Sequence, residues 1–288
     1  MINFVRLRIK LRRFIAKYMS SFVRLAFYLK IEMMNFQKKP PVIILTVGKV
    51  GSSSVYRTLK LKLSNYNVFH IHYFTEKSIK EAEHRHLNSD RRSIPLHLII
   101  SKILLKKINN YNGKIKFICI VREPISRSIS SFFQNIDFHK DSIEKIDLSI
   151  NTNRSLKILK KVLRTSLLTV EQWIETEIRE NLKIDIYKKP FEEKNFVTYK
   201  NKKFELLLLK MESLESGFKN SSKDFFNLNS SVSLLNHNIS ERKYYFEDYK
   251  KTKEKIKVEK EIIDTITSST YFKHFYKRES NYIYNKYL

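Results

Sequence analysis

The sequence contains few of the residues that interrupt or crosslink a chain. Its 288 residues include 4 glycines, 5 prolines and 1 cysteine. Because Cys119 stands alone, an intramolecular disulfide is impossible and a zinc site built on several cysteines is excluded. Glycine and proline are too scarce to form a linker, and no low-complexity segment separates two apolar halves. We therefore expect one large domain, with Cys119 packed in its core.

The sequence also lacks a long apolar run. No segment approaches the roughly 18 consecutive apolar residues that indicate a membrane-spanning helix. The amino terminus has neither the clean hydrophobic stretch nor the small-residue cleavage site of a secretory signal peptide. Since a lone cysteine is compatible with a reducing compartment, we expect a cytoplasmic protein.

Acidic residues are the third shortage. The chain has 29 Asp and Glu against 56 Lys and Arg, a formal net charge of +27. Such a charge often marks a nucleic-acid, membrane-surface or acidic-substrate partner. Here the excess is spread along the chain with many Ile, Asn and Lys residues, a bias that an AT-rich genome produces by itself. No basic and aromatic stretch resembles a nucleic-acid-binding module, so we expect no nucleic-acid partner.

Residues 1–30 are basic and amphipathic. Apolar residues recur every three or four positions, and most basic side chains lie outside their stripe. We predict that residues 1–38 form a helical extension and that residues 39–288 form the domain. The extension could lie peripherally on an anionic membrane surface, or its stripe could pack on the domain or on a partner helix, and both interpretations stay open. The stripe consists of Phe4, Leu7, Leu11, Ile15, Tyr18, Phe22, Leu25 and Leu29.

The rest of the chain is organised around residues 42–56. An apolar run rich in β-branched residues ends at Gly48 and predicts a strand buried on both faces. The chain must then turn sharply between Gly48 and Gly51, and a helix begins near Ser52. The helical spacing is set by Val55, Leu59 and Leu63.

This turn predicts an anion site. The first backbone N–H groups of a helix have no partner within the helix, and they favour phosphate or sulfate. Lys49 adds a mobile positive charge, and hydroxyl donors follow at Ser52, Ser53 and Ser54. The order differs from a Walker A loop, in which the lysine follows the second glycine. The alternative is an ordinary strand-turn-helix unit in which Ser52 only caps the helix.

Strand and helix patterns alternate along the remaining chain. This alternation predicts βαβ connections and a central, mostly parallel sheet flanked by helices. Ligands of such sheets collect at the carboxyl ends of the strands, where Lys49, His72 and Arg122 emerge. Further strands are predicted over residues 67–74, 115–121 and 204–211, and helices over residues 76–88, 96–108, 155–182, 238–257 and 259–276.

A second anion site is predicted directly after the strand over residues 115–121. Pro124 suits the first position of a helix, Arg122 leaves the strand, and Ser130 lies two turns into that helix. A guanidinium fork and a hydroxyl could grip one phosphate together. An arginine that only bonds a helix end is the alternative interpretation.

Two anion sites on neighbouring strand ends suit a 3′,5′-bisphosphorylated adenosine, and the chain resembles the sulfotransferases that use 3′-phosphoadenylyl sulfate (PAPS). Residues 122–130 resemble the 3′-phosphate motif of that family, with Arg122 and Ser130 at the matching positions. The resemblance implies a P-loop-like sulfotransferase fold, PAPS as donor and no metal. The turn resembles the 5′-phosphosulfate motif, with its cofactor contacts at Lys49, Gly51, Ser52, Ser53 and Ser54.

Later segments resemble a bacterial branch associated with capsular polysaccharide synthesis. Residues 243–246, Lys-Tyr-Tyr-Phe, depart from the Lys-Trp-Tyr-Ser pattern of that branch. The resemblance implies that the acceptor is a hydroxyl of a carbohydrate or polysaccharide. The similar segments are residues 130–135, 185–191, 210–214 and 274–276.

The implied reaction gives roles to particular side chains. Lys49 would neutralise the leaving oxygen, and a histidine would take the acceptor's proton. His72 is the first candidate for this base, with His70 and His97 behind it, although any of the three could instead be a core residue that bonds backbone. Two rival functions remain: a P-loop-type kinase of a small metabolite, and a non-enzymatic basic protein that binds a membrane surface or a polyanion.

Overall fold

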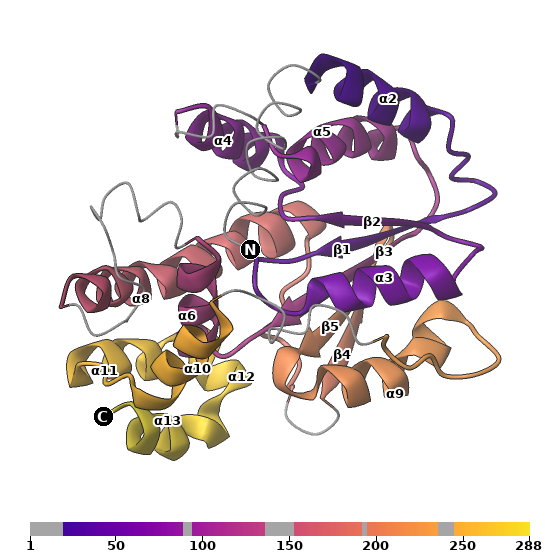
Figure 1. The fold of residues 1–288 in the computed structure, drawn as a ribbon. Helices are drawn as coiled ribbons and strands as arrows, with labels where there is room; N and C mark the ends of the chain where they lie inside the picture. Colours follow the sequence, from indigo (N-terminus) through magenta and orange to yellow (C-terminus); the bar gives the residue numbers. More distant parts are fainter. Residues whose placement is uncertain (1–19, 89–93, 136–152, 192–194, 236–244) are drawn as a thin grey trace.

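The chain forms a mixed α/β structure around one five-stranded sheet (Figure 1). The computed structural model describes residues 20–88, 94–135, 153–191, 195–235 and 245–288. The strand order is β2-β1-β3-β5-β4, and only the β4–β5 pair is antiparallel. The strands are β1 (Pro41–Leu45), β2 (Asn67–Ile71), β3 (Ile115–Val121), β4 (Phe196–Lys200) and β5 (Phe204–Lys210).

Helices cover both faces of the sheet, as the apolar strand sequences require. On one face, α3 (Ser52–Lys62) and α9 (Leu214–Phe226) pack against Val42 and Ile44. The other face carries α5 (Leu96–Asn109) and α6 (Pro124–Gln134), which pack with Ile43 and Phe117 in the larger core cluster. Cys119 is buried in this cluster, which confirms its predicted packing role, and this burial raises the pKa of its thiol to about 12.

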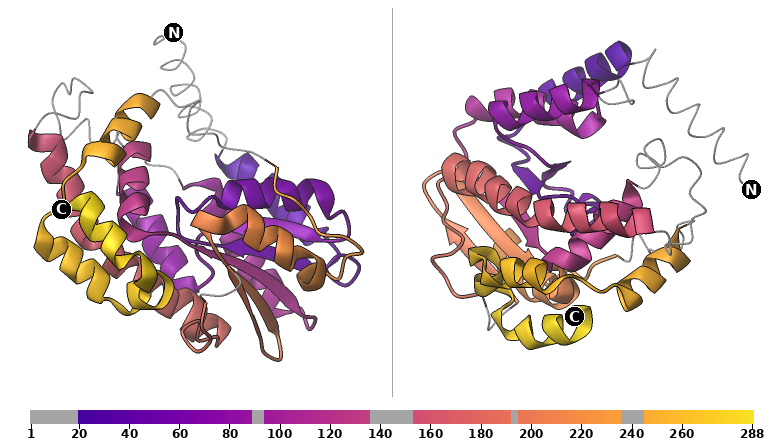
Figure 2. Two further views of the ribbon diagram at one scale, coloured as in Figure 1. Left: turned by 90° about the horizontal axis from the view of Figure 1, so that it is seen from below. Right: turned by 90° about the vertical axis from the view of Figure 1, so that its left-hand side faces the viewer.

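The remaining helices enlarge the hydrophobic core around the sheet. In Figure 1 and in the right-hand view of Figure 2, α2 and α5 lie at the opposite end of the molecule from the carboxyl-terminal helices. These elements are α2 (Ser20–Glu32), α4 (Glu76–Leu87), α8 (Asn153–Trp173), the π-helix η1 (Ile174–Glu180), η2 (Met211–Ser213), α10 (Phe246–Lys255), α11 (Lys260–Ser268), α12 (Thr270–Phe275), η4 (Lys277–Glu279) and α13 (Ser280–Tyr287).

The local predictions are largely confirmed, with corrections at element ends. The predicted strand over residues 67–74 stops at Ile71, because the polar groups of the next residues bond α8 and η1 instead of a neighbouring strand. The predicted helix over residues 259–276 is two helices, since Ser269 is extended and its hydroxyl accepts the Phe272 N–H. Strand β4 and helices α9 and α13 were not predicted.

The amphipathic extension is described only from α2 onward. Phe22, Leu25 and Leu29 of the predicted stripe are 68%, 55% and 50% exposed, so they do not pack on the described part of the domain. Ile31 and Phe36, which lie outside that stripe, are buried and attach α2 to the core. The other stripe positions lie outside the described residues, and the division at residues 38 and 39 stays a prediction.

No helix within the described ranges combines the length and the apolar character that a bilayer-crossing segment requires.

Candidate functional site

The turn between β1 and α3 is tight and left-handed at two positions. Lys49 and Gly51 have φ angles of 74° and 76°, and Val50 between them is buried. A non-glycine residue at positive φ carries backbone strain, which persists only where the surroundings enforce it. A Cβ on Gly51 would meet Met211 Sδ at 2.5 Å, so the turn also packs closely on η2.

The start of α3 differs from the alternative that Ser52 caps the helix. Gly51 is the N-cap, it offers no side-chain cap, and Ser52 is the first helical residue. The N-terminal N–H groups of α3 are therefore not covered by a capping side chain, which suits an anion. Ser52 is buried, while Ser53 and Ser54 are partly exposed at this helix start.

The two predicted anion segments are in direct contact. Arg122 Nη1 donates to the backbone oxygen of Lys49 at 2.7 Å, and Nη2 lies 3.5 Å from the Tyr249 hydroxyl. This contact follows from the topology, because β1 and β3 are parallel neighbours and the chain leaves both strands at the same end of the sheet. Ser130 lies further along α6 and is partly exposed.

The start of α6 is already occupied by a carboxylate of the chain itself. Glu123 accepts the N–H groups of Ile125 and Ser126 at 2.6 and 2.7 Å. Burial raises the pKa of Glu123, while these bonds act in the opposite direction. Any anion bound here must therefore rely on the side chains of Arg122 and Ser130, rather than on the helix end.

Three side chains from the carboxyl-terminal half hold this segment, and no local sequence pattern indicates these contacts. The Tyr271 hydroxyl accepts the Arg122 N–H at 3.0 Å and donates to the Arg122 carbonyl at 2.9 Å. Glu212 accepts the Glu123 N–H at 2.9 Å and the Tyr276 hydroxyl at 3.0 Å. Burial raises the pKa values of both tyrosines, so they stay protonated and able to donate.

The predicted histidines form a row beside the anion turn. His72 Nδ1 lies 2.6 Å from the carbonyl oxygen of Thr46, just before the turn. The His72 ring is 5.2 Å from the His70 ring and 5.0 Å from the His97 ring, both edge to face, and His86 continues the row 6.5 Å from His97. The structure thus brings all three candidate bases together, with His72 next to Thr46.

Burial keeps these histidines neutral. It lowers the pKa of His72, and it lowers the pKa values of His70 and His97 to about 3, with a further contribution from the neighbouring imidazoles. A neutral His72 that donates from Nδ1 to Thr46 carries its lone pair on Nε2, which is the arrangement of a general base. His70 Nε2 is buried without a hydrogen-bond partner among the described residues.

The π-helix η1 and the end of α8 fix the chain around His72. Trp173 Nε1 donates to the His72 carbonyl at 2.7 Å. Glu177 accepts the Phe74 N–H at 2.7 Å and the Thr75 hydroxyl at 3.0 Å. Helical spacing in the sequence predicts only a core role for Trp173, and the one sequence signal for Glu177 is that it is an acidic residue on an otherwise apolar helix face. π-helical turns often occur where a functional site needs an irregular backbone.

The neutral histidines predict a loss of stability in acid. His70 and His97 have pKa values near 6.5 when unfolded and about 3 in the fold, so unfolding takes up protons between these limits. The free energy of unfolding should be fully retained above pH 6.5 and fall as the pH is lowered towards 3. Urea unfolding at about pH 7.5 and about pH 5 measures this, before most carboxylates titrate.

The matched variant for this experiment is the double substitution His70→Gln and His97→Gln. It should be less stable than the wild type at about pH 7.5 through lost packing, yet show a smaller loss between the two pH values. Equal urea midpoints for the wild type at both pH values would contradict the buried neutral histidines.

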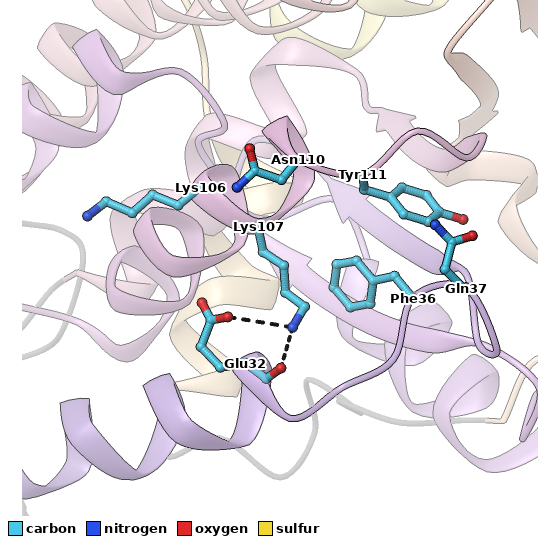
Figure 3. Close-up of a pocket in the computed structure, with 7 residues that line it drawn as sticks. All are labelled: Glu32, Phe36, Gln37, Lys106, Lys107, Asn110 and Tyr111. Carbon is cyan, nitrogen blue, oxygen red and sulfur yellow. Dashed lines mark hydrogen bonds and ion pairs between the residues drawn. The ribbon is translucent and has the colours of Figure 1, made fainter.

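Among the hollows in the described part of the chain, two lie near the sheet, and the larger of these two adjoins the histidine row. The larger, about 560 Å³, is lined in part by His70 and His97. The smaller, about 280 Å³, lies where the chain enters β1 and β3 (Figure 3). This is the opposite end of these strands from Lys49 and Arg122. Its Lys107 ammonium lies 2.5 Å from the Glu32 backbone oxygen and 3.7 Å from the Glu32 carboxylate, so it ties α2 to α5. Within the described ranges, no cluster of three or more His, Cys, Asp or Glu suits a metal ion.

A family model matches part of the chain. Residues 147–277 match the NKWYS family model, described as "Putative capsular polysaccharide synthesis protein". No curated protein and no solved structure matches the chain. The matched region includes Trp173, Glu177, Glu212, Tyr271 and Tyr276, which hold the backbone of the site, but not the turn at Lys49. Of the divergent residues 243–246, only Tyr245 and Phe246 are described, and the Tyr245 ring lies 5.8 Å from that of Phe133.

Proposed function

We propose that this protein transfers a sulfuryl group from PAPS to a hydroxyl of a carbohydrate acceptor, in the synthesis of a capsular or cell-surface polysaccharide. One observation carries the proposal: Arg122 bonds the backbone of Lys49, which joins the two anion segments at neighbouring strand ends. The strand-turn-helix unit at Lys49 and the sheet order support a P-loop-like sulfotransferase fold. The match of residues 147–277 supports the polysaccharide context.

The residues present fit this donor. The uncapped start of α3 and the hydroxyls of Ser52, Ser53 and Ser54 would bind the 5′-phosphosulfate, while Arg122 and Ser130 would bind the 3′-phosphate. The buried Glu123 does not compete for Arg122, because its carboxylate is engaged by the N–H groups of α6.

In the proposed reaction, the chain positions the groups and stabilises charge. The acceptor oxygen bonds to sulfur as the bond from sulfur to the 5′-phosphate oxygen breaks, and adenosine 3′,5′-bisphosphate leaves. Lys49 neutralises the charge that develops on this phosphate oxygen, and Nε2 of His72 takes the acceptor's proton. The His70 and His97 rings pack against the His72 ring, and burial lowers the pKa of His72, which keeps it neutral.

Replacing Arg122 with alanine should weaken the binding of adenosine 3′,5′-bisphosphate far more than the binding of adenosine 5′-phosphate. Loss of a charge-assisted fork costs on the order of 2 kcal/mol, or roughly 30-fold in Kd, and only the first ligand carries the 3′-phosphate. Titration calorimetry without added metal measures both affinities. Arg57→Ala, which removes an exposed arginine of α3, is the matched control and should change neither.

Two results would count against this assignment. An equal loss for both nucleotides would show that Arg122 supports the turn at Lys49 instead of binding the 3′-phosphate. Tight binding of ATP with Mg²⁺, and none of the bisphosphate, would favour a kinase.

A further inference from the structure

The 560 Å³ cavity beside the histidine row is not needed for the donor. It lies along β2, the edge strand of the sheet, and is bordered by α2, α3 and α5. Its volume falls within the range of about 300–1,000 Å³ that is typical of small-molecule sites. Most of its lining is apolar or aromatic, as with Phe27, Met34, Val68 and Ile100.

The charged side chains that line the cavity are all positive. Lys30 of α2 and Lys60 of α3 are exposed side chains that contribute to its lining, and the Lys60 ammonium lies 5.6 Å from the centre of the Tyr56 ring. No Asp or Glu occurs among the residues that line the cavity, and burial holds the lining His70 and His97 in the neutral form. An apolar space with cationic groups at its border complements a molecule that has a hydrocarbon part and a negative charge.

Helix α2 presents apolar side chains in two directions. Phe27 and Ile31 line the cavity, whereas Phe22, Leu25 and Leu29 are exposed. On a helical projection, Lys30 lies between these two faces. A helix with exposed apolar residues next to a basic one is suited to lie in the interface of a lipid surface. If the exposed face of α2 lies on a lipid surface, the cavity on the other face of α2 is close to that surface, and an amphiphile could enter the cavity from it.

We propose that this cavity binds the hydrocarbon chain of an anionic membrane amphiphile, with Lys30 and Lys60 meeting its charged head group and the exposed face of α2 resting on the lipid surface. The binding does not depend on the donor, so it goes beyond the proposed transfer and can fail or succeed independently. Because His70 and His97 line the same cavity, the bound molecule would lie next to the row that includes His72.

The proposal is tested on the full chain with monododecyl phosphate as probe, below its micelle concentration, by titration calorimetry. Saturable binding is expected, with butyl phosphate and dodecyltrimethylammonium bound at least about ten-fold more weakly because each lacks one of the two features. Ile100→Trp, which fills the cavity, should abolish binding, while Leu61→Trp, at an exposed position beside Lys60, should not.

The charges are tested separately, because Ile100→Trp could unfold the protein. The double variant Lys30→Glu and Lys60→Glu changes only exposed side chains, so it should stay folded and bind the probe about ten-fold or more weakly. Unchanged affinity in this variant, or no saturable binding by the wild type, would overturn the proposal.

The role of α2 has its own measurement. Phe22→Ser, Leu25→Ser and Leu29→Ser together should leave binding of the monomeric probe intact. The same variant should take up much less dodecyl phosphate than the wild type does from phosphatidylcholine vesicles that contain this probe. Uptake from vesicles at the wild-type level would show that the exposed face of α2 does not contact the lipid surface.

Discussion

Lys49→Ala is expected to lower the rate of sulfuryl transfer by about three powers of ten or more, while adenosine 3′,5′-bisphosphate still binds. The ammonium is proposed to act on an oxygen that becomes charged only as its bond to sulfur breaks, so its interaction is stronger in the transition state than in the bound product. Single-turnover rates with PAPS, and the bisphosphate affinity from calorimetry, separate the two quantities.

The backbone at this position requires a second variant. Lys49 has a φ angle of 74°, which is strained for alanine but readily adopted by glycine. Lys49→Gly should therefore be as inactive as Lys49→Ala, since both lack the ammonium, whereas Lys49→Arg should retain part of the activity. Recovery of activity in Lys49→Gly would show that the backbone of the turn, rather than the charge, explains the loss in Lys49→Ala.

His72→Ala is expected to lower turnover by roughly two to four powers of ten without affecting bisphosphate affinity, because the ring is proposed to take the acceptor's proton. The pH profile follows from the lowered pKa of His72. The sequence alone predicts activity that rises with pH through about 6.5. In the structure the neutral form persists below that value, so activity should be level at neutral pH and fall only on the acid side of 6.5.

His70→Ala and His97→Ala are the internal controls for this base. Neither ring contacts Thr46 in the way that His72 does, and both are expected to reduce turnover much less. If His72→Ala stays near the wild-type rate and one of the others is inactive, the base is that residue. If all three remain active, none of these three histidines is the base.

The features that were predicted correctly depend on residues close together in the chain. The turn at Lys49 follows from an apolar run, two glycines and a helical repeat within residues 42–63, and β3 is recognisable from seven consecutive residues. Helix α6 begins at Pro124 for the same local reason. The end of β2 at Ile71 was harder to predict, because contacts with the distant Trp173 and Glu177 decide where it falls.

The histidines show the limit of local inference. Alternation along a strand predicts that His70 and His72 share a face, and their rings do lie side by side. Their neutral state, and the addition of His97 to the row, depend on how α5 packs against the edge of β2. No pattern within either segment reports that packing.

The sequence by itself determined an α/β sheet with Lys49, His72 and Arg122 at the carboxyl ends of its strands, because strand and helix periodicity are local properties. Only the tertiary structure decided that Arg122 bonds Lys49, that Trp173 holds His72 from 101 positions away, and that an apolar cavity borders the histidines. These features arise when strands pair and helices dock, and the geometry of that packing is not written in any one segment of the chain.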